Sequence, residues 1–266
     1  MLCLLAGALS YLLICFYRRY HIYQLNEDTP RNLSFIVDLM KLRQEKLDRT
    51  LIFFNSVNTL TTMYQYLRRE IGQSIGEQNP MLVMFTSHTD QTIKENILAD
   101  LNNPDGLVRV VLCTSALSVG VSVSSVKYVI HYGAPTHAQE FVQETGRAAR
   151  EHYLHGHSIL LTFPRMNPKG LSPTMKTYIA GEKCRRKILL EAFQCDTAIS
   201  QVHGCCDICD RTMTFSIKDI LVQHIVKGHV DPSFSSTNTS DSGSSRLAPS
   251  LNDIDSASVV SSNDTV

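Results

Sequence analysis

Two arginines stand three residues apart behind a glycine in the segment 143–150, which reads Gln-Glu-Thr-Gly-Arg-Ala-Ala-Arg. A guanidinium is planar and permanently charged, so it binds phosphate oxygens through paired hydrogen bonds and stabilises the charge that develops in phosphoryl transfer. This spacing suits a phosphate site in which one of Arg147 and Arg150 meets a terminal phosphate and the other holds the register. The alternative is a pair of arginines on the solvated face of a helix.

The chain also has eight cysteines, five of them between positions 184 and 209. Clustered cysteines indicate a metal site rather than a disulfide framework, and they favour a reducing, intracellular compartment. Four thiolates fit tetrahedral zinc, and a site closed by four protein ligands is structural. The predicted ligands are Cys184, Cys205, Cys206 and Cys209.

A rival zinc site uses Cys206 and Cys209 together with His224 and His229, in the spacing of a two-Cys two-His finger whose small core would contain Phe215 and Leu221. Both sites need the same two cysteines, so they exclude each other when each holds one zinc. Cys195 and His203 are alternatives to Cys205, and cysteines packed in a core without metal are a third interpretation.

A third group of polar residues follows Cys113, where the chain reads Thr-Ser-Ala-Leu-Ser-Val-Gly-Val-Ser from Thr114 to Ser122. Hydroxyls and exposed amides at the end of a strand suit the phosphates of a nucleotide or of a nucleic-acid backbone. The same residue types also fill turns that bind nothing.

Alternating apolar runs and helical periodicity predict the scaffold for these residues. Helical spacing runs from Val57 to Leu67, over 93–101 and over 138–149, and apolar runs predict strands at 49–54, 81–85, 108–113, 126–131 and 158–163. Strands that alternate with helices imply a mostly parallel α/β sheet covered on both faces, with ligands at the carboxyl ends of the strands.

The order of four segments resembles the second lobe of superfamily 2 helicases, and most closely that of the RecQ family. The segments are Phe-Phe-Asn-Ser at 53–56, Thr-Ser-His at 86–88, the Thr114 loop and the arginine segment. The RecQ pattern Gln-Glu-x-Gly-Arg-Ala-Gly-Arg-Asp is matched except that Ala149 replaces a glycine and Glu151 an aspartate. The resemblance implies a RecA-like three-layer α/β fold. The family's Gly-Met-Gly-Ile-Asp/Asn reads Ser-Val-Gly-Val-Ser at 118–122, which weakens the expected coupling of DNA binding to hydrolysis.

The resemblance also implies roles for the matching positions. Arg150 would be the arginine finger and Arg147 a second catalytic arginine of the ATP cleft. The nucleotide would be bound by Gln143, Gly120 and Gly146, and the nucleic acid by Asn55, Ser87, His88, Thr114 and Ser115. The other histidines, including His131, are expected to pack rather than to catalyse, because none has a base-and-orienter partner at a diagnostic spacing.

The cysteine cluster fits the same resemblance. RecQ helicases carry a zinc module directly after the second lobe, which begins with Cys-Arg-Arg and ends with Cys-Asp-x-Cys, and Werner-type members have an adjacent Cys-Cys pair. This chain reads Cys-Arg-Arg from Cys184 and Cys-Cys-Asp-Ile-Cys from Cys205.

The sequence contains neither the phosphate-binding motif Gly-x4-Gly-Lys-Ser/Thr nor an Asp-Glu pair that would hold magnesium. The resemblance implies one half of a 3′–5′ DNA helicase. Because these motifs are missing, we expect that it needs a first lobe for ATP and Mg and that this polypeptide alone does not hydrolyse ATP. The alternative is a nucleic-acid-binding or regulatory zinc module that derives from a helicase. The expected partners are single-stranded or junction DNA and a separate first-lobe polypeptide, in the nucleus, in DNA repair or recombination.

Composition and the ends of the chain complete the expectations. Lys+Arg and Asp+Glu number 25 each, so nucleic-acid contacts must be local. The apolar run 2–16 is short for a membrane span, so membrane binding is not expected, and a marginal membrane anchor is the alternative. A cytoplasmic location is the alternative to the nucleus. The expected domains are an apolar segment and lead-in at 1–31, the helicase lobe at 32–164, the zinc module at 174–213, an amphipathic helix at 214–230 and a disordered Ser-rich tail at 231–266.

Overall fold

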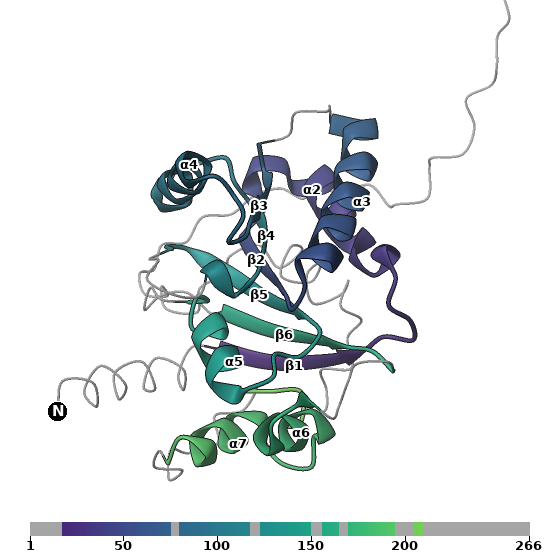
Figure 1. Cartoon of the computed structure of the whole chain (residues 1–266), viewed down its shortest axis with the longest axis vertical. Coiled ribbons are helices and arrows are strands. Elements are labelled where there is room, and N and C mark those ends of the chain that lie inside the picture. The colour runs from purple at the N-terminus through teal and green to yellow at the C-terminus, as the bar shows by residue number, and fades with distance from the viewer. Residues whose placement is uncertain are drawn as a thin grey trace, which may run out of the picture. The chain divides into compact units, whose positions relative to one another are not determined.

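A computed structural model describes residues 18–75, 80–117, 123–149, 156–164, 170–194 and 205–209. Six strands form one sheet in the order β1-β6-β5-β2-β4-β3, and every neighbouring pair is parallel. The strands are β1 (Arg18–Gln24), β2 (Arg49–Phe54), β3 (Leu82–Phe85), β4 (Val110–Cys113), β5 (Val126–Tyr132) and β6 (Gly156–Thr162). The parallel RecA-like α/β fold that the sequence predicts is confirmed (Figure 1).

Helices cover both faces of the sheet, because alternate residues of each central strand point to opposite sides. One face packs against α2 (Ser34–Arg43) and α3 (Val57–Ile75) through Ile52, Leu112 and Ile130. On the other face, Phe53, Val111 and Val129 belong to a core that also contains residues of α4 (Gln91–Asn102). Strands that are buried on both faces explain the nearly continuous apolar runs in the sequence.

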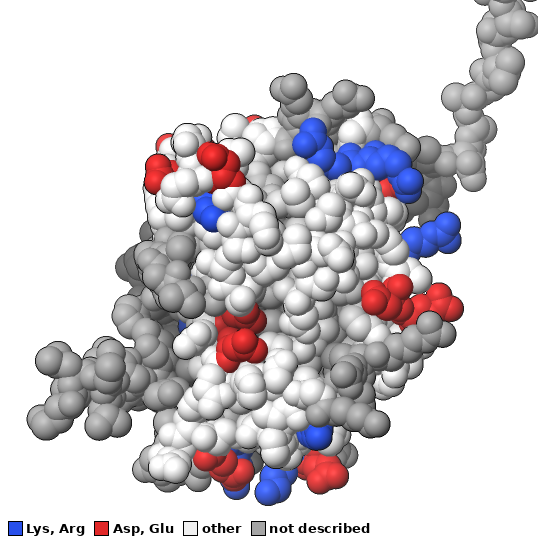
Figure 2. Space-filling view, viewed as in Figure 1, with Lys and Arg blue, Asp and Glu red and all other residues white. Residues whose placement is uncertain are grey.

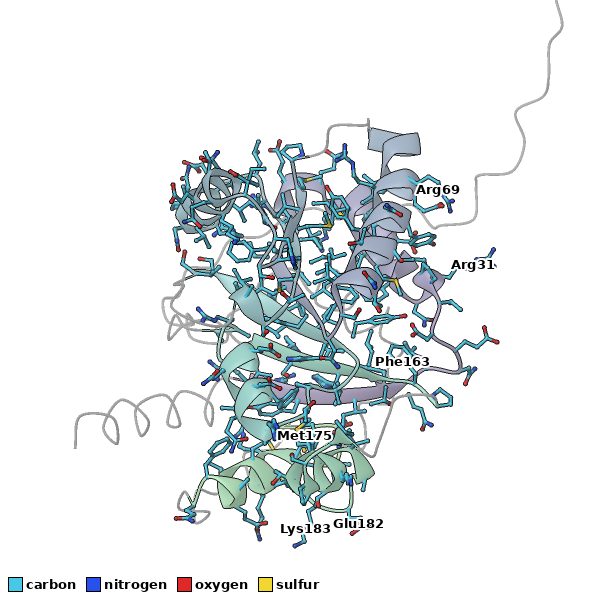
Figure 3. All side chains as sticks on the ribbon, viewed as in Figure 1. Arg31, Arg69, Phe163, Met175, Glu182 and Lys183 are labelled. Carbon is cyan, nitrogen blue, oxygen red and sulfur yellow. The ribbon has the colours of Figure 1, made fainter. Side chains whose placement is uncertain are left out.

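A third cluster of buried residues attaches the cysteine region to the sheet. It contains Tyr20 of β1 and Leu160 of β6, and it joins α5 (Ala138–Thr145) to α6 (Pro173–Ala180) and α7 (Arg185–Ala192). Figure 3 shows Met175 of α6 pointing toward the sheet, while Glu182 and Lys183 point away from it. Consistent with this view, Met175 is fully buried.

The first strand is an addition to the five strands that the sequence predicts. Residues 18–24 pair along their whole length with β6, although they lie in the segment interpreted as a lead-in. The strand reads Arg-Arg-Tyr-His-Ile-Tyr-Gln, and its inward positions include Arg18 and His21, each 2% exposed. Buried polar side chains hide the apolar alternation by which strands are recognised. The helix α2 and the 3₁₀ helices η1 (Pro30–Leu33), η2 (Gln44–Lys46) and η3 (Ser115–Leu117) are further additions.

Other expectations fall on residues that the structure does not describe: the apolar segment as far as residue 17, the helix 214–230 and the tail 231–266. The domain limits stay predictions. Among the described helices, none combines the length and apolar character needed to cross a membrane.

Candidate functional site

The arginine turn, as we call residues 146–149, follows directly after α5. Helix α5 ends at Thr145, whereas the sequence pattern predicts a helix as far as Ala149. The amides of Gly146, Arg147 and Ala148 donate to the carbonyls of Val142, Glu144 and Thr145 at 2.8, 3.1 and 3.0 Å, so the chain tightens into a turn. Arg147 is therefore not part of the helix, and the interpretation of the two arginines as one exposed helix face is wrong for this residue.

The backbone of Ala149 ends the turn and anchors it to the sheet. Its φ is +51°, and its amide donates to the carbonyl of Val126, the first residue of β5, at 2.9 Å. A glycine is the usual residue in this left-handed region, because a Cβ is crowded there. Ala149 takes the place of the glycine in the RecQ pattern, and the structure gives it a glycine-like conformation.

Arg147 itself is 3% exposed. Burial raises the pKa of the Cys113 thiol well above its ordinary value, the negative charge of Glu144 raises it further, and the positive charge of Arg147 lowers it. The guanidinium of Arg147 therefore lies within electrostatic reach of the end of β4. Gln143 is exposed on α5 and Gly146 is half-buried, whereas Arg150 and Gly120 lie outside the described residues.

A buried pair beside the turn is absent from the sequence-based predictions. His131 Nε2 and Glu144 Oε2 are 3.0 Å apart, with side chains 1% and 6% exposed. The His131 ring stacks on Phe53 and packs on Phe141. The i, i+3 spacing of Phe141 and Glu144 puts both on the inner face of α5, and this spacing is the one signal in the sequence for the pair.

The predicted nucleic-acid residues lie at the carboxyl ends of the strands. Asn55, Ser87 and Thr114 follow the carboxyl ends of β2, β3 and β4, which are adjacent strands. The Asn55 side-chain amide donates to the carbonyl of Ala134, 2.8 Å away, and the Thr114 amide to that of Phe85, 3.3 Å away. The arginine turn, in contrast, touches the amino ends of β5, β6 and β1, so the expectation that all ligands meet the carboxyl ends does not apply to it.

Exposure and charge limit what this carboxyl edge offers to a ligand. Asn55, Ser87, His88 and Ser115 are exposed and Thr114 is half-buried, although the Asn55 amide already donates to Ala134 and Ser87 Oγ lies 3.3 Å from His88 Nδ1. The amino end of α4 is already capped, because Asp90 accepts from the amides of Thr92 and Ile93. On the face in Figure 2, Lys and Arg form small separate groups and no continuous basic track.

The four predicted cysteine ligands lie together at the amino end of α7. All four sulfur atoms lie within 4.8 Å of one another, and Cys184 Sγ is 3.6 Å from Cys205 Sγ and 4.0 Å from Cys206 Sγ. A tetrahedral zinc–thiolate site, with Zn–S bonds of about 2.3 Å, separates its sulfurs by about 3.8 Å. The cluster therefore has the dimensions for a metal ion. His224, His229, Cys195 and His203 of the alternative sites lie outside the described residues.

Hydrogen bonds among the four thiols shift the pKa values of Cys184 and Cys205 in opposite directions. Hydrogen bonds from Cys205 and Cys206 lower the pKa of Cys184 far below its ordinary value, and the bond to Cys184 raises that of Cys205. Burial raises the pKa of Cys209 to about 12. Hydrogen bonds within the cluster thus favour loss of a proton from Cys184, and metal binding has to displace the protons that remain on the other thiols.

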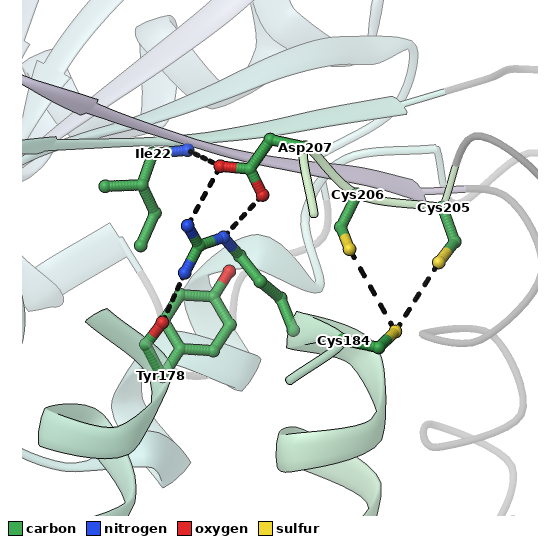
Figure 4. A network of polar contacts seen from close by, with 7 residues as sticks. Ile22, Tyr178, Cys184, Cys205, Cys206 and Asp207 are labelled. Carbon is green, nitrogen blue, oxygen red and sulfur yellow. Dashed lines mark hydrogen bonds and ion pairs between the residues drawn. The ribbon is translucent and has the colours of Figure 1, made fainter. Parts of the chain in front are cut away.

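Asp207 joins the cysteine segment both to α7, through a bidentate ion pair with Arg185, and to the sheet, through the amide of Ile22 (Figure 4). Arg185 donates to both carboxylate oxygens of Asp207, from Nε at 2.6 Å and from Nη2 at 2.9 Å, and its Nη1 donates to the carbonyl of Tyr178. Asp207 Oδ2 also accepts from the amide of Ile22 in β1, at 3.1 Å. The segment 205–209 is therefore attached to the edge strand of the sheet.

Comparison with known proteins assigns the lobe. Residues 31–152 match the model of the helicase conserved C-terminal domain. This segment is a helicase C-terminal domain. It includes the strands β2 to β5, the predicted nucleic-acid residues and the arginine turn, whereas β1 and β6 lie outside it.

The relatives of the helicase domain include proteins named as RNA helicases and proteins named as DNA helicases. The chain is 33% identical over 120 residues to a protein described as an ATP-dependent RNA helicase, from Acanthamoeba polyphaga mimivirus, with 39% of this chain and 21% of the relative covered. It is 33% identical over 122 residues to the ATP-dependent DNA helicase RecQ of Pasteurella multocida, covering 38% and 18%. A bifunctional 3′–5′ exonuclease and ATP-dependent helicase of Mus musculus is 28% identical over 126 residues, covering 38% and 9%.

The chain thus spans about a fifth or less of the length of these relatives. Among solved structures, helicase Lhr of Mycobacterium smegmatis is similar with a TM-score of 0.48 and 19% identity, over 67% of this chain and 22% of Lhr. The domain match therefore carries the assignment, and it does not distinguish DNA from RNA as the nucleic acid.

Proposed function

We propose that the helicase C-terminal domain and the cysteine cluster are the second lobe and zinc module of a RecQ-like 3′–5′ DNA helicase. The observation that carries the proposal is the position of the four-cysteine cluster, which directly follows the lobe in the chain and is attached to its edge strand. This order of lobe and cysteine module is the one that the RecQ resemblance implies. The RNA helicases among the relatives make the choice of DNA the part that most needs a test.

In this proposal Arg150 reaches the γ-phosphate of ATP bound to a first lobe, and Arg147 supports it from inside the turn. A fixed cation beside the transferred phosphoryl group stabilises the transition state, and an arginine finger typically contributes about 10³–10⁵-fold to turnover. Gln143 and Gly146 complete the wall of the nucleotide cleft, together with Gly120. A first lobe supplies the phosphate loop and the magnesium ligands.

The carboxyl edge supplies the nucleic-acid contacts. The exposed side chains of Asn55, Ser87, His88 and Ser115, with Thr114, offer hydroxyl, amide and imidazole groups to phosphate oxygens. Such contacts position a strand without reading its sequence. The proposed zinc at the cysteine cluster is structural: with four protein ligands it has no open position for a substrate. Nuclear location and a role in DNA repair or recombination belong to the same proposal.

The proposal is tested by mixing the chain with a RecQ-type first lobe and measuring ATP turnover with single-stranded DNA, with single-stranded RNA and without nucleic acid. DNA-stimulated turnover above that of the first lobe alone is expected, and Arg150→Ala should abolish the gain. Arg69→Ala is the matched control, because Arg69 is an exposed arginine whose side chain is 68% accessible.

Two results would count against the proposal. Stimulation by RNA but not by DNA would assign the chain to an RNA helicase. Turnover that never exceeds that of the first lobe alone would favour a non-catalytic nucleic-acid-binding or regulatory module.

A further inference from the structure

Arg18, the first residue of β1, reaches across to the arginine turn. It is 2% exposed. Its Nε donates to the carbonyl of Ala148 at 2.7 Å, and its Nη2 donates to the carbonyl of Gly146 at 3.1 Å. These two carbonyls lie on either side of Arg147. A guanidinium holds its donors in a fixed plane, so one side chain sets the direction of the backbone before and after Arg147.

The energetic cost of burying Arg18 indicates that the position requires an arginine. A buried charge is destabilising unless hydrogen bonds compensate for the lost water, and an apolar side chain fills such a position at lower cost. The last carbonyls of a helix lack partners within the helix and carry partial negative charge. Arg18 provides both donors and positive charge just after α5 ends, which a hydrophobic residue cannot do.

The cysteine segment holds β1 from its other edge. The Tyr20 amide donates to the carbonyl of Cys205 at 3.1 Å, and the Asp207 amide donates to the carbonyl of Tyr20 at 3.0 Å. Arg186, two residues after Cys184, donates from Nη2 to the carbonyl of Arg18 itself, at 2.9 Å. The cluster and the arginine turn therefore share β1 as their common support.

We infer that Arg18 is a positioning residue for the arginine turn, and that the cysteine cluster keeps Arg18 in place through β1. The catalytic consequence of this inference rests on the proposed function, whereas the structural link does not. A metal ion in the cluster then stabilises the geometry of a phosphate-binding turn that it does not touch.

Hydrogen exchange of the full chain tests the first link. Arg18→Lys keeps the charge, but one ammonium group does not reproduce the planar fork that holds two carbonyls. The loss of one such hydrogen bond should speed exchange of the Ala148 and Ala149 amides about tenfold and leave the amides of α4 unchanged. Arg19→Ala is the matched control, because Arg19 is the half-buried neighbour in the same strand. Unchanged exchange at Ala148 and Ala149 in folded Arg18→Lys would overturn the inference.

Removal of the metal tests the second link. Zinc-loaded chain treated with a chelator should show faster exchange at Tyr20 and Ile22 and also at Ala149. If chelation unfolds the chain, Arg186→Lys gives the same reading without a change to any cysteine, because the link from Nη2 to the Arg18 carbonyl is weakened. Faster exchange in β1 with unchanged exchange in the arginine turn would refute the inference that the cysteine cluster stabilises the turn through β1.

Kinetics with an added first lobe separate positioning from general stability. Arg18→Lys should lower kcat about tenfold and leave the KM for ATP within about twofold, because the finger is misplaced and the nucleotide is bound elsewhere. A parallel loss of kcat in Arg19→Ala would contradict this role. If the wild-type chain gives no turnover, the proposed function fails, while the exchange experiments still decide whether Arg18 holds the turn.

Discussion

At the scale of single residues, the arginine turn is a tightly packed piece of backbone. Ala149 has a φ of +51°, a conformation that costs an L-residue about 1–2 kcal/mol. A Cβ added to Gly156, the first residue of β6, would lie 2.8 Å from the Cβ of Ala149 and 2.9 Å from that of Ala148. The glycine therefore lets the turn lie directly against the sheet.

Gly156→Ala should destabilise the chain by about 2 kcal/mol, because the new methyl group overlaps the turn and overpacking typically costs 1–3 kcal/mol. The free energy of unfolding from urea titrations measures this. Ala149→Gly removes one of the two overlapping methyl groups and relieves the left-handed strain, so the double variant should recover part of the loss. Additive effects of the two changes would mean that the turn does not pack on β6 as described.

The buried His131–Glu144 pair has a separate role at this scale, in fixing the last turn of α5. Glu144→Ala should cost about 3 kcal/mol, because it leaves the ring nitrogen of His131 buried without its partner. Glu144→Gln keeps an acceptor of the same shape and should cost less than half as much. Thermal and urea unfolding of both variants check the order, and equal losses would show that only packing matters here.

At the scale of elements, β1 connects the cysteine segment to the rest of the sheet. It pairs with β6 on one side and contacts the cysteine segment on the other. Arg185 and Asp207 supply the polar contact between that segment and the helical pair α6 and α7. A bidentate pair that is mostly buried is sensitive to the loss of one partner, because the remaining charge is then uncompensated.

Asp207→Asn should accordingly weaken metal retention about tenfold, because the neutral amide holds the guanidinium and the Ile22 amide less well and loosens the segment that carries three of the four cysteines. Competition with a chromophoric zinc chelator measures the change. The control is Lys187→Ala, since Lys187 on α7 is half-exposed and lies 3.9 Å from Glu191 in an exposed pair. Equal retention in both variants would contradict this coupling.

The cysteine cluster should bind one zinc ion and release fewer than four protons, because hydrogen bonds from the neighbouring thiols lower the pKa of Cys184 while burial raises the pKa of Cys209. Zinc titration in a weakly buffered solution with a pH indicator measures the protons. Cys184→Ser should lose the metal, and Cys113→Ser should keep it, since Cys113 is a buried free cysteine outside the cluster. Release of four protons would contradict the lowered pKa of Cys184.

The sequence was sufficient for elements with strong periodicity. The strands around 49–54 and 126–131 and the long helix after Asn55 were predicted near their observed positions because apolar side chains fill both faces of the inner sheet. The strand β1 was missed because its buried positions include Arg18 and His21, whose partners lie more than 100 residues away. The end of α5 was predicted at Ala149 but lies at Thr145. The positive φ of Ala149 and its contact with the sheet override the helical pattern of the sequence.

Prediction of the site followed the same division. The four cysteines of the predicted zinc site lie together in the structure, as their residue type and spacing indicated. The arginine segment was recognised from its residue types, but its location at the amino edge was not, since that depends on how α5 returns along the sheet. The support from Arg18 has no local signal at all.

At the scale of the whole molecule, the sheet carries candidate site residues at both ends of its strands. The carboxyl ends of β2, β3 and β4 carry the proposed nucleic-acid residues, and the amino ends of β5, β6 and β1 hold the arginine turn. Two ligands can then contact opposite ends of the strands of one sheet. In the proposed function, the turn is one wall of an ATP cleft, and the first lobe is the other wall.

The most direct test of this account is the affinity of a RecQ-type first lobe for ADP with a beryllium fluoride phosphate mimic, measured with and without this chain. A finger that reaches the terminal phosphate adds a charge-assisted contact, so the chain should tighten binding at least about tenfold, and Arg150→Ala should remove that gain. The Arg69→Ala control should bind like the wild type. An affinity that does not change when the wild-type chain is added would contradict the claim that this arginine turn completes an ATP site.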